Sequence, residues 1–185
     1  MNRDKQSIYT IKDIALIAIF AAIISVLSLI VIPVGTVPFT LQTFGVFLVS
    51  ATLGAKRGIT CVVIYVLLGT LGLPIFGGQG GLQKILGPTG GFITGFIMAS
   101  IIIALAVKIS AKVTGKLRLI IIILGMFLGD VLCMLLGTLQ FMVVEKVSMA
   151  AAFGYCVLPF IIPEIIKITV AAVLSINIRK RIPKI

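Results

Sequence analysis

The stretch Leu119–Gln140, LIIIILGMFLGDVLCMLLGTLQ, decides the fold. The only Asp, Glu, Lys or Arg in it is Asp130, and its length is about what an α-helix needs to cross the ~30 Å hydrocarbon core of a bilayer. Similar apolar runs recur along the chain. Apolar residues make up 60% of the 185 residues and charged residues only 11%, which is too little polar surface for a water-soluble globule. The sequence therefore predicts an all-α integral membrane protein.

Six apolar runs are predicted to be membrane-spanning helices in a single transmembrane domain, residues 1–185. They lie at residues 14–32, 39–53, 58–73, 92–107, 119–140 and 153–178. Several of these runs are shorter than the ~20 residues that a straight spanning helix needs. Tilted, kinked or incompletely spanning helices are therefore expected among them.

The distribution of cations predicts the orientation. Most cations flank the runs: Arg3, Lys5, Lys12, Lys56, Arg57, Lys108, Lys112, Lys116, Arg118, Arg179, Lys180, Arg181 and Lys184. With six spans, all of these lie on one side of the membrane, and only Lys84 and Lys146 lie on the other. Because cytoplasmic loops carry an excess of Lys and Arg, both termini of this multi-pass protein are predicted to be cytoplasmic.

Several functional classes are disfavoured by composition. The net charge of +11 does not indicate nucleic-acid binding, because the cations flank apolar runs and form no basic face. Cys61, Cys133 and Cys156 lie inside apolar runs without C-x-x-C spacing, and the chain has no histidine, so no metal site is predicted. An enzyme is also disfavoured, since there is no histidine base and no aspartate pair within the spans. No cofactor is predicted.

Three residues that are charged at neutral pH lie inside apolar runs, where a charge costs roughly 2.5–3.5 kcal/mol on insertion scales. Glu164 and Lys167 are three residues apart, which places them on one face of a helix. Either they form a mutual ion pair, or they keep hydrogen-bonding capacity for a polar ligand. Asp130 follows Gly125-x-x-x-Gly129, a spacing that brings helices close. It either lines the same pocket or pairs with a loop cation.

Pro159 and Pro163 precede the charged pair. Proline cannot donate an N–H to the carbonyl four residues back, so the last helix is predicted to kink or to begin late here. Carbonyls freed by such an opening are tolerated in a membrane only against protein or a water-filled cavity. A cavity wall is therefore predicted in the outer half of the sixth run, with a simple proline kink as the alternative.

The longest break between runs, residues 74–91, holds seven glycines and two prolines. Glycine permits close backbone approach and positive φ angles. This segment is predicted to fold over a ligand as a lid. The side chains that it would offer to the ligand are Gln79, Gln83, Lys84 and Thr89. A flexible connector is the alternative.

In the first run, Ala18 and Ala22 form a smooth stripe at helical spacing. Small residues let helices approach closely. The stripe is predicted either to pack inside the bundle or to form a docking surface for a helix of another subunit.

Three motifs occur in order along the chain. They are VPFTLQTF at residues 37–44, GLPIFGG at 72–78 running into GPTGG at 87–91, and LPF at 158–160 followed by an acid and a lysine three apart. With these motifs the chain resembles the BioY family, the biotin-specific S components of energy-coupling factor (ECF) transporters. The resemblance extends from the second run to the sixth.

The resemblance implies a six-helix S-component bundle in a bacterial cell membrane that captures biotin from the outside. It also implies two kinds of partner, a membrane-embedded coupling subunit and two cytoplasmic ATPase subunits. Ala18 and Ala22 match the alanine-spaced helix that contacts the coupling subunit, and Glu164 and Lys167 are similar to ligand-contacting positions. The chain departs from the family at Pro163-Glu164, where Gly-Asp is common.

The chemistry of biotin suits the candidate residues. Lys167 or Lys84 is expected to take the carboxylate, and Glu164 a ureido N–H. Gln79 or Gln83 is expected to take the ureido carbonyl. Aromatic residues are expected to cover the rings: Phe76, Phe92, Phe160 and Tyr65. The chain has no G-x-x-x-x-G-K-[ST] loop, so ATP hydrolysis has to come from another subunit. The alternative is a stand-alone secondary carrier for biotin or another small carboxylate.

Overall fold

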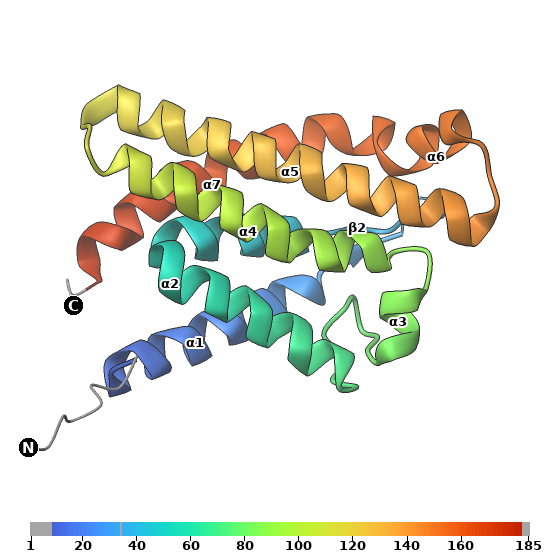
Figure 1. Ribbon diagram of the computed structural model, residues 1–185, viewed down its shortest axis with the longest axis horizontal. Helices are drawn as coiled ribbons and strands as arrows, with labels where there is room; N and C mark the ends of the chain where they lie inside the picture. The colour runs from blue at the N-terminus through green and yellow to red at the C-terminus, as the bar shows by residue number, and fades with distance from the viewer. Residues whose placement is uncertain (1–8, 34, 183–185) are drawn as a thin grey trace, which may run out of the picture.

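The computed structural model describes residues 9–33 and 35–182 and shows a bundle of lengthwise-packed helices (Figure 1). Five helical segments in these ranges are long and apolar enough to cross a membrane. They are α1 (Ile11–Ser28), α2 (Gln42–Thr70), α4 (Gly90–Ser110), α5 (Gly115–Glu145) and a broken segment, Met149–Arg181. The structure is thus that of a multi-pass membrane protein.

Helix α2 contains both the second and the third predicted runs. It is broken at Gly54, where φ is 77° and ψ is −166°, a conformation open essentially only to glycine. The two arms fold back on each other. They are so close that a β-carbon placed on Gly58, in the second arm, would lie 3.0 Å from the Cα of Ser50 in the first. Figure 1 shows this reversal at the left end of the bundle. The predicted break between these runs therefore corresponds to a turn within α2.

The last predicted run, residues 153–178, is also broken. It comprises α6 (Met149–Cys156), the 3₁₀ turn η1 (Leu158–Phe160) and α7 (Ile161–Arg181). Pro159 lies in η1, and Pro163 lies in the first turn of α7. A proline there costs little, because the first N–H groups of a helix have no intrahelical acceptor. The chain thus opens immediately before the charged pair, as the two prolines predict.

Two short elements lie outside the all-α expectation. Strands β1 (Val31–Ile32) and β2 (Phe39–Thr40) form an antiparallel pair, in which Val31 faces Thr40. The predicted runs 14–32 and 39–53 are therefore too long, because α1 ends at Ser28 and α2 begins at Gln42. A five-residue helix, α3 (Leu82–Leu86), lies within the glycine-rich segment. Each element is too short to give a periodic pattern in the sequence.

Small residues set the close packing of α4 against α5. A β-carbon on Gly125 would lie 2.2 Å from the Cβ of Ala106, and one on Gly129 would lie 3.1 Å from the carbonyl oxygen of Ala99. The Gly125-x-x-x-Gly129 spacing thus brings the two helices together, as predicted. The main core lies between α1, α2 and α4, around the fully buried Ile24 and Val62.

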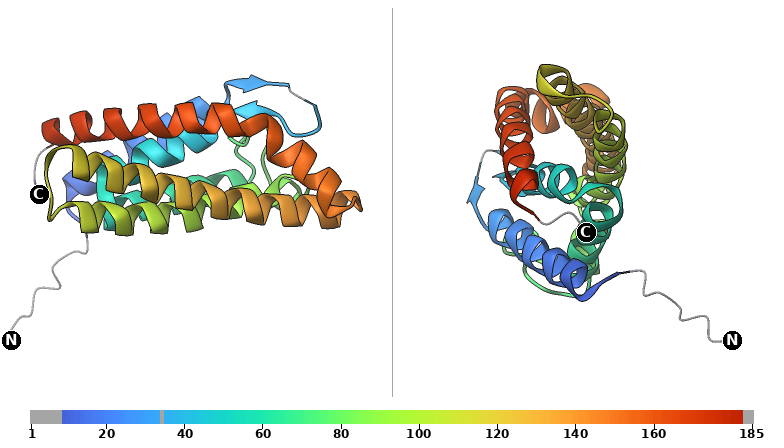
Figure 2. Two further views of the ribbon diagram at one scale, coloured as in Figure 1. Left: turned by 90° about the horizontal axis from the view of Figure 1, so that it is seen from above. Right: turned by 90° about the vertical axis from the view of Figure 1, so that its left-hand side faces the viewer.

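The two ends of the bundle differ in character. The start of α1, the turn of α2, the α4–α5 connection and the end of α7 lie at one end, and the β-strands, α3 and α6 lie at the other (Figures 1 and 2). At the first end, Arg57 pairs with Asp13, and Arg179 Nη1 donates to the Ala51 carbonyl oxygen at 3.2 Å. The connections that carry most of the cations therefore gather at one end. Arg3, Lys5 and Lys184 lie outside the described residues.

Candidate functional site

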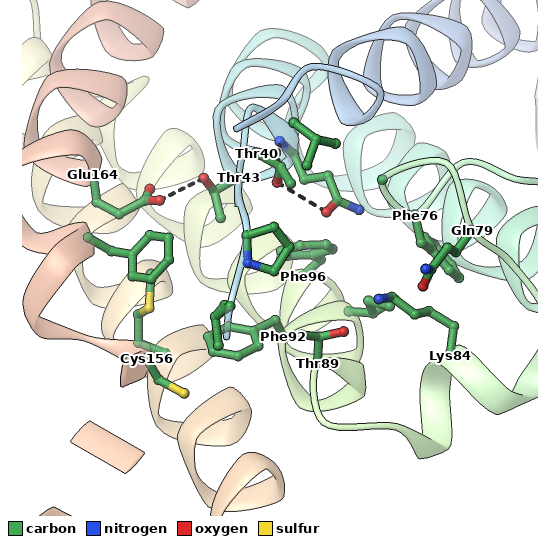
Figure 3. Close-up of a pocket in the computed structure, with 18 of the residues that line it drawn as sticks. Thr40, Thr43, Phe76, Gln79, Lys84, Thr89, Phe92, Phe96, Cys156 and Glu164 are labelled. Carbon is green, nitrogen blue, oxygen red and sulfur yellow. Dashed lines mark hydrogen bonds between the residues drawn. The ribbon is translucent and has the colours of Figure 1, made fainter. Parts of the chain in front are cut away.

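A cavity of about 240 Å³ opens at the end opposite the cation-rich connections. It is larger than the ~150 Å³ apolar cavity that holds a benzene molecule in an engineered protein. Its polar side chains are Thr40, Gln42, Thr43, Gln79, Lys84, Thr89, Glu164 and Lys167, and its aromatic side chains are Phe76, Phe92, Phe96 and Phe160 (Figure 3). All three resemblance motifs contribute to its walls.

Lys167 is the centre of a buried hydrogen-bond network. Its Nζ donates to Glu164 Oε1 at 2.8 Å, to Thr43 Oγ1 at 2.9 Å and to the Thr40 carbonyl oxygen at 2.7 Å. The same ammonium lies 4.1 Å from the centre of the Phe39 ring. Since an ammonium carries three N–H donors, all of them are used within the protein. Lys167 therefore joins α7 to the β2–α2 junction and has no donor to spare for a ligand carboxylate.

Glu164 keeps one free acceptor. Its Oε1 accepts from Lys167 and from Thr43 Oγ1, the latter at 3.0 Å, whereas Oε2 is buried without a hydrogen-bond partner in the described ranges. Leaving a buried acceptor unsatisfied costs about 1–3 kcal/mol. Of the two alternatives for this pair, the mutual ion pair is present in the structure, and one oxygen of the carboxylate still has the capacity to accept a hydrogen bond from a ligand N–H.

Thr40 and Thr43 lie within the VPFTLQTF motif and are site residues that no pattern in the sequence distinguishes. Gln42, between them, donates from Nε2 to the Tyr65 hydroxyl at 2.6 Å, and this hydroxyl donates to the Ile75 carbonyl oxygen at 2.7 Å. The Tyr65 ring meets Phe76 edge-on, with centroids 5.6 Å apart. Tyr65 thus supports the cavity wall from behind and does not line the cavity.

The glycine-rich segment forms one wall of the cavity. Phe76 N donates to the Gln79 carbonyl oxygen at 2.8 Å, which closes a tight turn. Gln140 on α5 donates from Nε2 to the carbonyl oxygens of Ile85 at 2.7 Å and Gly87 at 2.8 Å, which fixes α3 over the bundle. Gln83 is exposed and lies outside the cavity lining. The predicted lid is therefore an anchored wall in this structure.

The wall supplies a cation and a hydroxyl. Lys84 is half-buried and has no ion-pair or hydrogen-bond partner within the described chain, and its burial lowers the pKa of the ammonium. Thr89 Oγ1 is buried and is likewise without a partner there. Figure 3 shows Lys84 and Gln79 on one side of the cavity and Glu164 on the other. The cavity therefore has a cationic end and an acceptor end, with Phe92 between them.

Asp130 lies outside this cavity. It is 7% exposed, and it lines a second cavity of about 430 Å³ between α5 and the α6–α7 segment. Glu164, Phe160 and Met134 border both cavities. Asp130 forms no ion pair with any cation that the structure describes. The two expectations for Asp130 were a place in the main pocket and a pairing with a loop cation, and the structure shows neither.

Ala18 and Ala22 lie on the outer face of α1. Both are exposed, whereas Phe20, Ala21 and Ile24 face the bundle and are buried. Of the two alternatives from the sequence, internal packing does not describe these two alanines. Their smooth stripe is available to another helix.

Comparisons with known proteins agree with the resemblance. The family model described as "BioY family" matches residues 1–184. The chain is 38% identical over 165 residues to a probable biotin transporter BioY of Pyrococcus horikoshii, covering 89% of this chain and 94% of that one. It is 35% identical over 156 residues to the biotin transporter BioY2 of Lactococcus lactis subsp. cremoris, covering 84% and 83%.

The structure is also similar to a crystal structure of the S component for biotin from an ECF-type ABC transporter. The TM-score is 0.81 at 27% sequence identity, and the match covers 97% of this chain and 95% of the other. These matches cover most of this chain and most of each protein that it is compared with, and the sequence and the fold indicate the same family. The chain therefore belongs to the BioY family.

Proposed function

We propose that this chain is the biotin-binding S component of an ECF transporter, which captures biotin from the outside for ATP-driven uptake. The printed names of the relatives support biotin as the substrate. The observation that carries the proposal is the two-ended cavity. Among the described residues, the cation at one end has no partner, and neither does one carboxylate oxygen at the other end. Biotin matches this pattern, since it has a carboxylate at one end and ureido N–H donors at the other.

The hydrogen bonds of Lys167 support one orientation of the ligand over the other. The sequence left either Lys84 or Lys167 to bind the carboxylate, but Lys167 already donates to three acceptors. We assign the carboxylate to Lys84, with Gln79 beside it, and a ureido N–H to Glu164 Oε2. This places Gln79 at the carboxylate end, and not at the ureido carbonyl. The apolar bicycle would lie against aromatic rings, as is usual for small-molecule pockets: Phe76, Phe92 and Phe160.

The proposal also includes a membrane orientation and partner subunits. The cation-rich connections gather at one end, which supports cytoplasmic termini and an outward-facing cavity in a cell membrane. The exposed stripe of Ala18 and Ala22 is proposed to dock on the coupling subunit. The two ATPase subunits would supply ATP hydrolysis, for which the chain itself carries no phosphate-binding loop.

Calorimetric titration tests the substrate. The purified protein in lipid nanodiscs is titrated with biotin, riboflavin and thiamine, and only biotin is expected to give saturable heat. Saturable heat with another of these vitamins and none with biotin would refute the assignment.

Two further measurements separate the subunit from a stand-alone carrier. Affinity purification from the native membrane is expected to recover an ATPase pair with this chain. In the second measurement, the chain alone is reconstituted in proteoliposomes, and it should bind biotin without accumulating it. Accumulation driven by an ion gradient would favour the secondary carrier.

A further inference from the structure

The second cavity is a groove that faces the bilayer. Its rim consists of apolar side chains on α5, α6 and α7 that remain about half exposed: Phe127 at 49%, Val131 at 48%, Phe153 at 46% and Ile165 at 53%. In a membrane-spanning bundle, side chains exposed on the flanks of these helices meet lipid. A ligand therefore reaches this groove through the bilayer, and its body has to be apolar to match the walls.

The base of the groove carries two acidic side chains that are almost fully buried. Asp130 is 7% exposed and Glu164 is 4% exposed. One oxygen of each, Asp130 Oδ1 and Glu164 Oε2, has no hydrogen-bond partner in the part of the chain that the structure describes. Two unsatisfied acceptors in one apolar groove are costly, and each would be stabilised by an N–H donor.

The charges around the groove do not balance. Lys167 is paired with Glu164, and no described cation pairs with Asp130. Two carboxylates and one ammonium leave one negative charge at the base of the groove when all three are ionised. A buried charge within the membrane is normally paired, so an occupant with a single positive charge would complete the set.

The shape and lining decide between kinds of cation. A hard metal ion needs about six oxygen ligands, which is more than two carboxylates and the Thr138 hydroxyl offer in a single shell. A proton on Asp130 would remove the charge, with lipid acyl chains filling the apolar space of about 430 Å³; that state predicts no preference for an ammonium over a neutral alcohol of the same size. An anion would be repelled. An organic ammonium fits both features, because its N–H donors match the free Asp130 Oδ1 and its apolar body matches the aromatic walls.

We propose that the groove between α5 and the α6–α7 segment is a second binding site, for a lipophilic organic ammonium whose charge pairs with Asp130. Asp130 borders only this groove, whereas Glu164 borders the biotin cavity as well. The ammonium is therefore assigned to Asp130, and Glu164 Oε2 is left to the biotin ureido N–H, so that failure of one assignment leaves the other standing. The proposal also gives a function to Asp130, the one intramembrane charge that the biotin cavity does not use.

The test compares three probes of the same size that differ in charge: benzylammonium, benzyl alcohol and benzoate. Each is titrated calorimetrically into the protein in nanodiscs, with empty nanodiscs subtracted. Benzylammonium is expected to bind to the wild type more tightly than benzyl alcohol, and benzoate is not expected to bind. Asp130→Asn should weaken benzylammonium at least about tenfold, as expected for a lost charge-assisted hydrogen bond, and leave benzyl alcohol unchanged.

Two further variants complete the test. Glu145→Gln removes an exposed carboxylate at the end of the same helix and should change nothing. Val131→Phe fills the rim and should weaken both benzylammonium and benzyl alcohol. Equal affinity of wild type and Asp130→Asn for benzylammonium would overturn the proposal, as would equal affinity of the wild type for benzylammonium and benzyl alcohol. No saturable benzylammonium heat in the wild type would also overturn it. The melting temperature of each variant shows whether it is folded.

Discussion

Replacement of Lys84 by methionine is predicted to weaken biotin binding by removing the cation at one end of the cavity. A hydrogen bond to a charged group contributes about 1.5–3 kcal/mol. Lys84 is only half-buried, so water screens the interaction and the lower part of this range applies. At about 1.4 kcal/mol for each factor of ten, Lys84→Met should raise the Kd for biotin roughly 10- to 30-fold.

The assay is a matched pair of titrations. Each variant is titrated with biotin and with biotinamide, in which a neutral amide replaces the carboxylate. Lys84→Met should bind biotin weakly, but it should bind biotinamide as well as the wild type does, because the lost interaction depends on the ligand's charge. Lys146→Met is the control, since it removes an exposed cation that does not line the cavity.

Two outcomes would refute the reasoning. If Lys84→Met bound biotin as tightly as the wild type, the carboxylate would not lie at Lys84. If the variant lost affinity for biotin and biotinamide equally, Lys84 would shape the wall and not pair with the carboxylate.

Three further predictions concern the same cavity. Glu164→Ala removes the partner of a buried ammonium, so it should lower the free energy of unfolding by about 3 kcal/mol or more and abolish biotin binding. The loss of stability is measured as a lower Tm, and the control Glu145→Ala should change neither property. Gly69→Ala places a β-carbon 2.2 Å from the Phe76 ring, which should push that ring out of the cavity wall and weaken biotin binding in titrations. Gly154→Ala is the control, because a β-carbon there meets open space. Burial lowers the pKa of Lys84, and the ammonium is lost as the pH rises through that pKa. Biotin affinity should therefore fall at alkaline pH, and Lys84→Arg should flatten this dependence of biotin affinity on pH. A pH profile that is the same in both proteins would contradict this last prediction.

The spanning helices could be predicted from the sequence because their apolar runs are long. The break in α2 was placed correctly between the second and third runs, where a polar Lys56-Arg57 pair interrupts the pattern. The β1–β2 pair could not be predicted, since strands of two residues carry no periodicity. Helix α3 was missed for the same reason.

The candidate site was only partly predictable. The three-residue spacing of Glu164 and Lys167 was enough to place them on one face, because that relation is local to a helix. The sequence could not show that all three N–H donors of Lys167 are used, because one acceptor, the Thr40 carbonyl oxygen, is 127 residues away in the chain. The separation of Asp130 from the main cavity likewise depends on how α5 packs against α7, which no local pattern encodes.

A structure of the protein with bound biotin would test the central claim most directly. The account predicts that the biotin carboxylate lies within hydrogen-bond distance of Lys84 Nζ. It also predicts that a ureido N–H donates to Glu164 Oε2, while Lys167 keeps its bonds to Thr40, Thr43 and Glu164. A reversed ligand, with its carboxylate on Lys167 and its ureido ring at Lys84, would contradict the account.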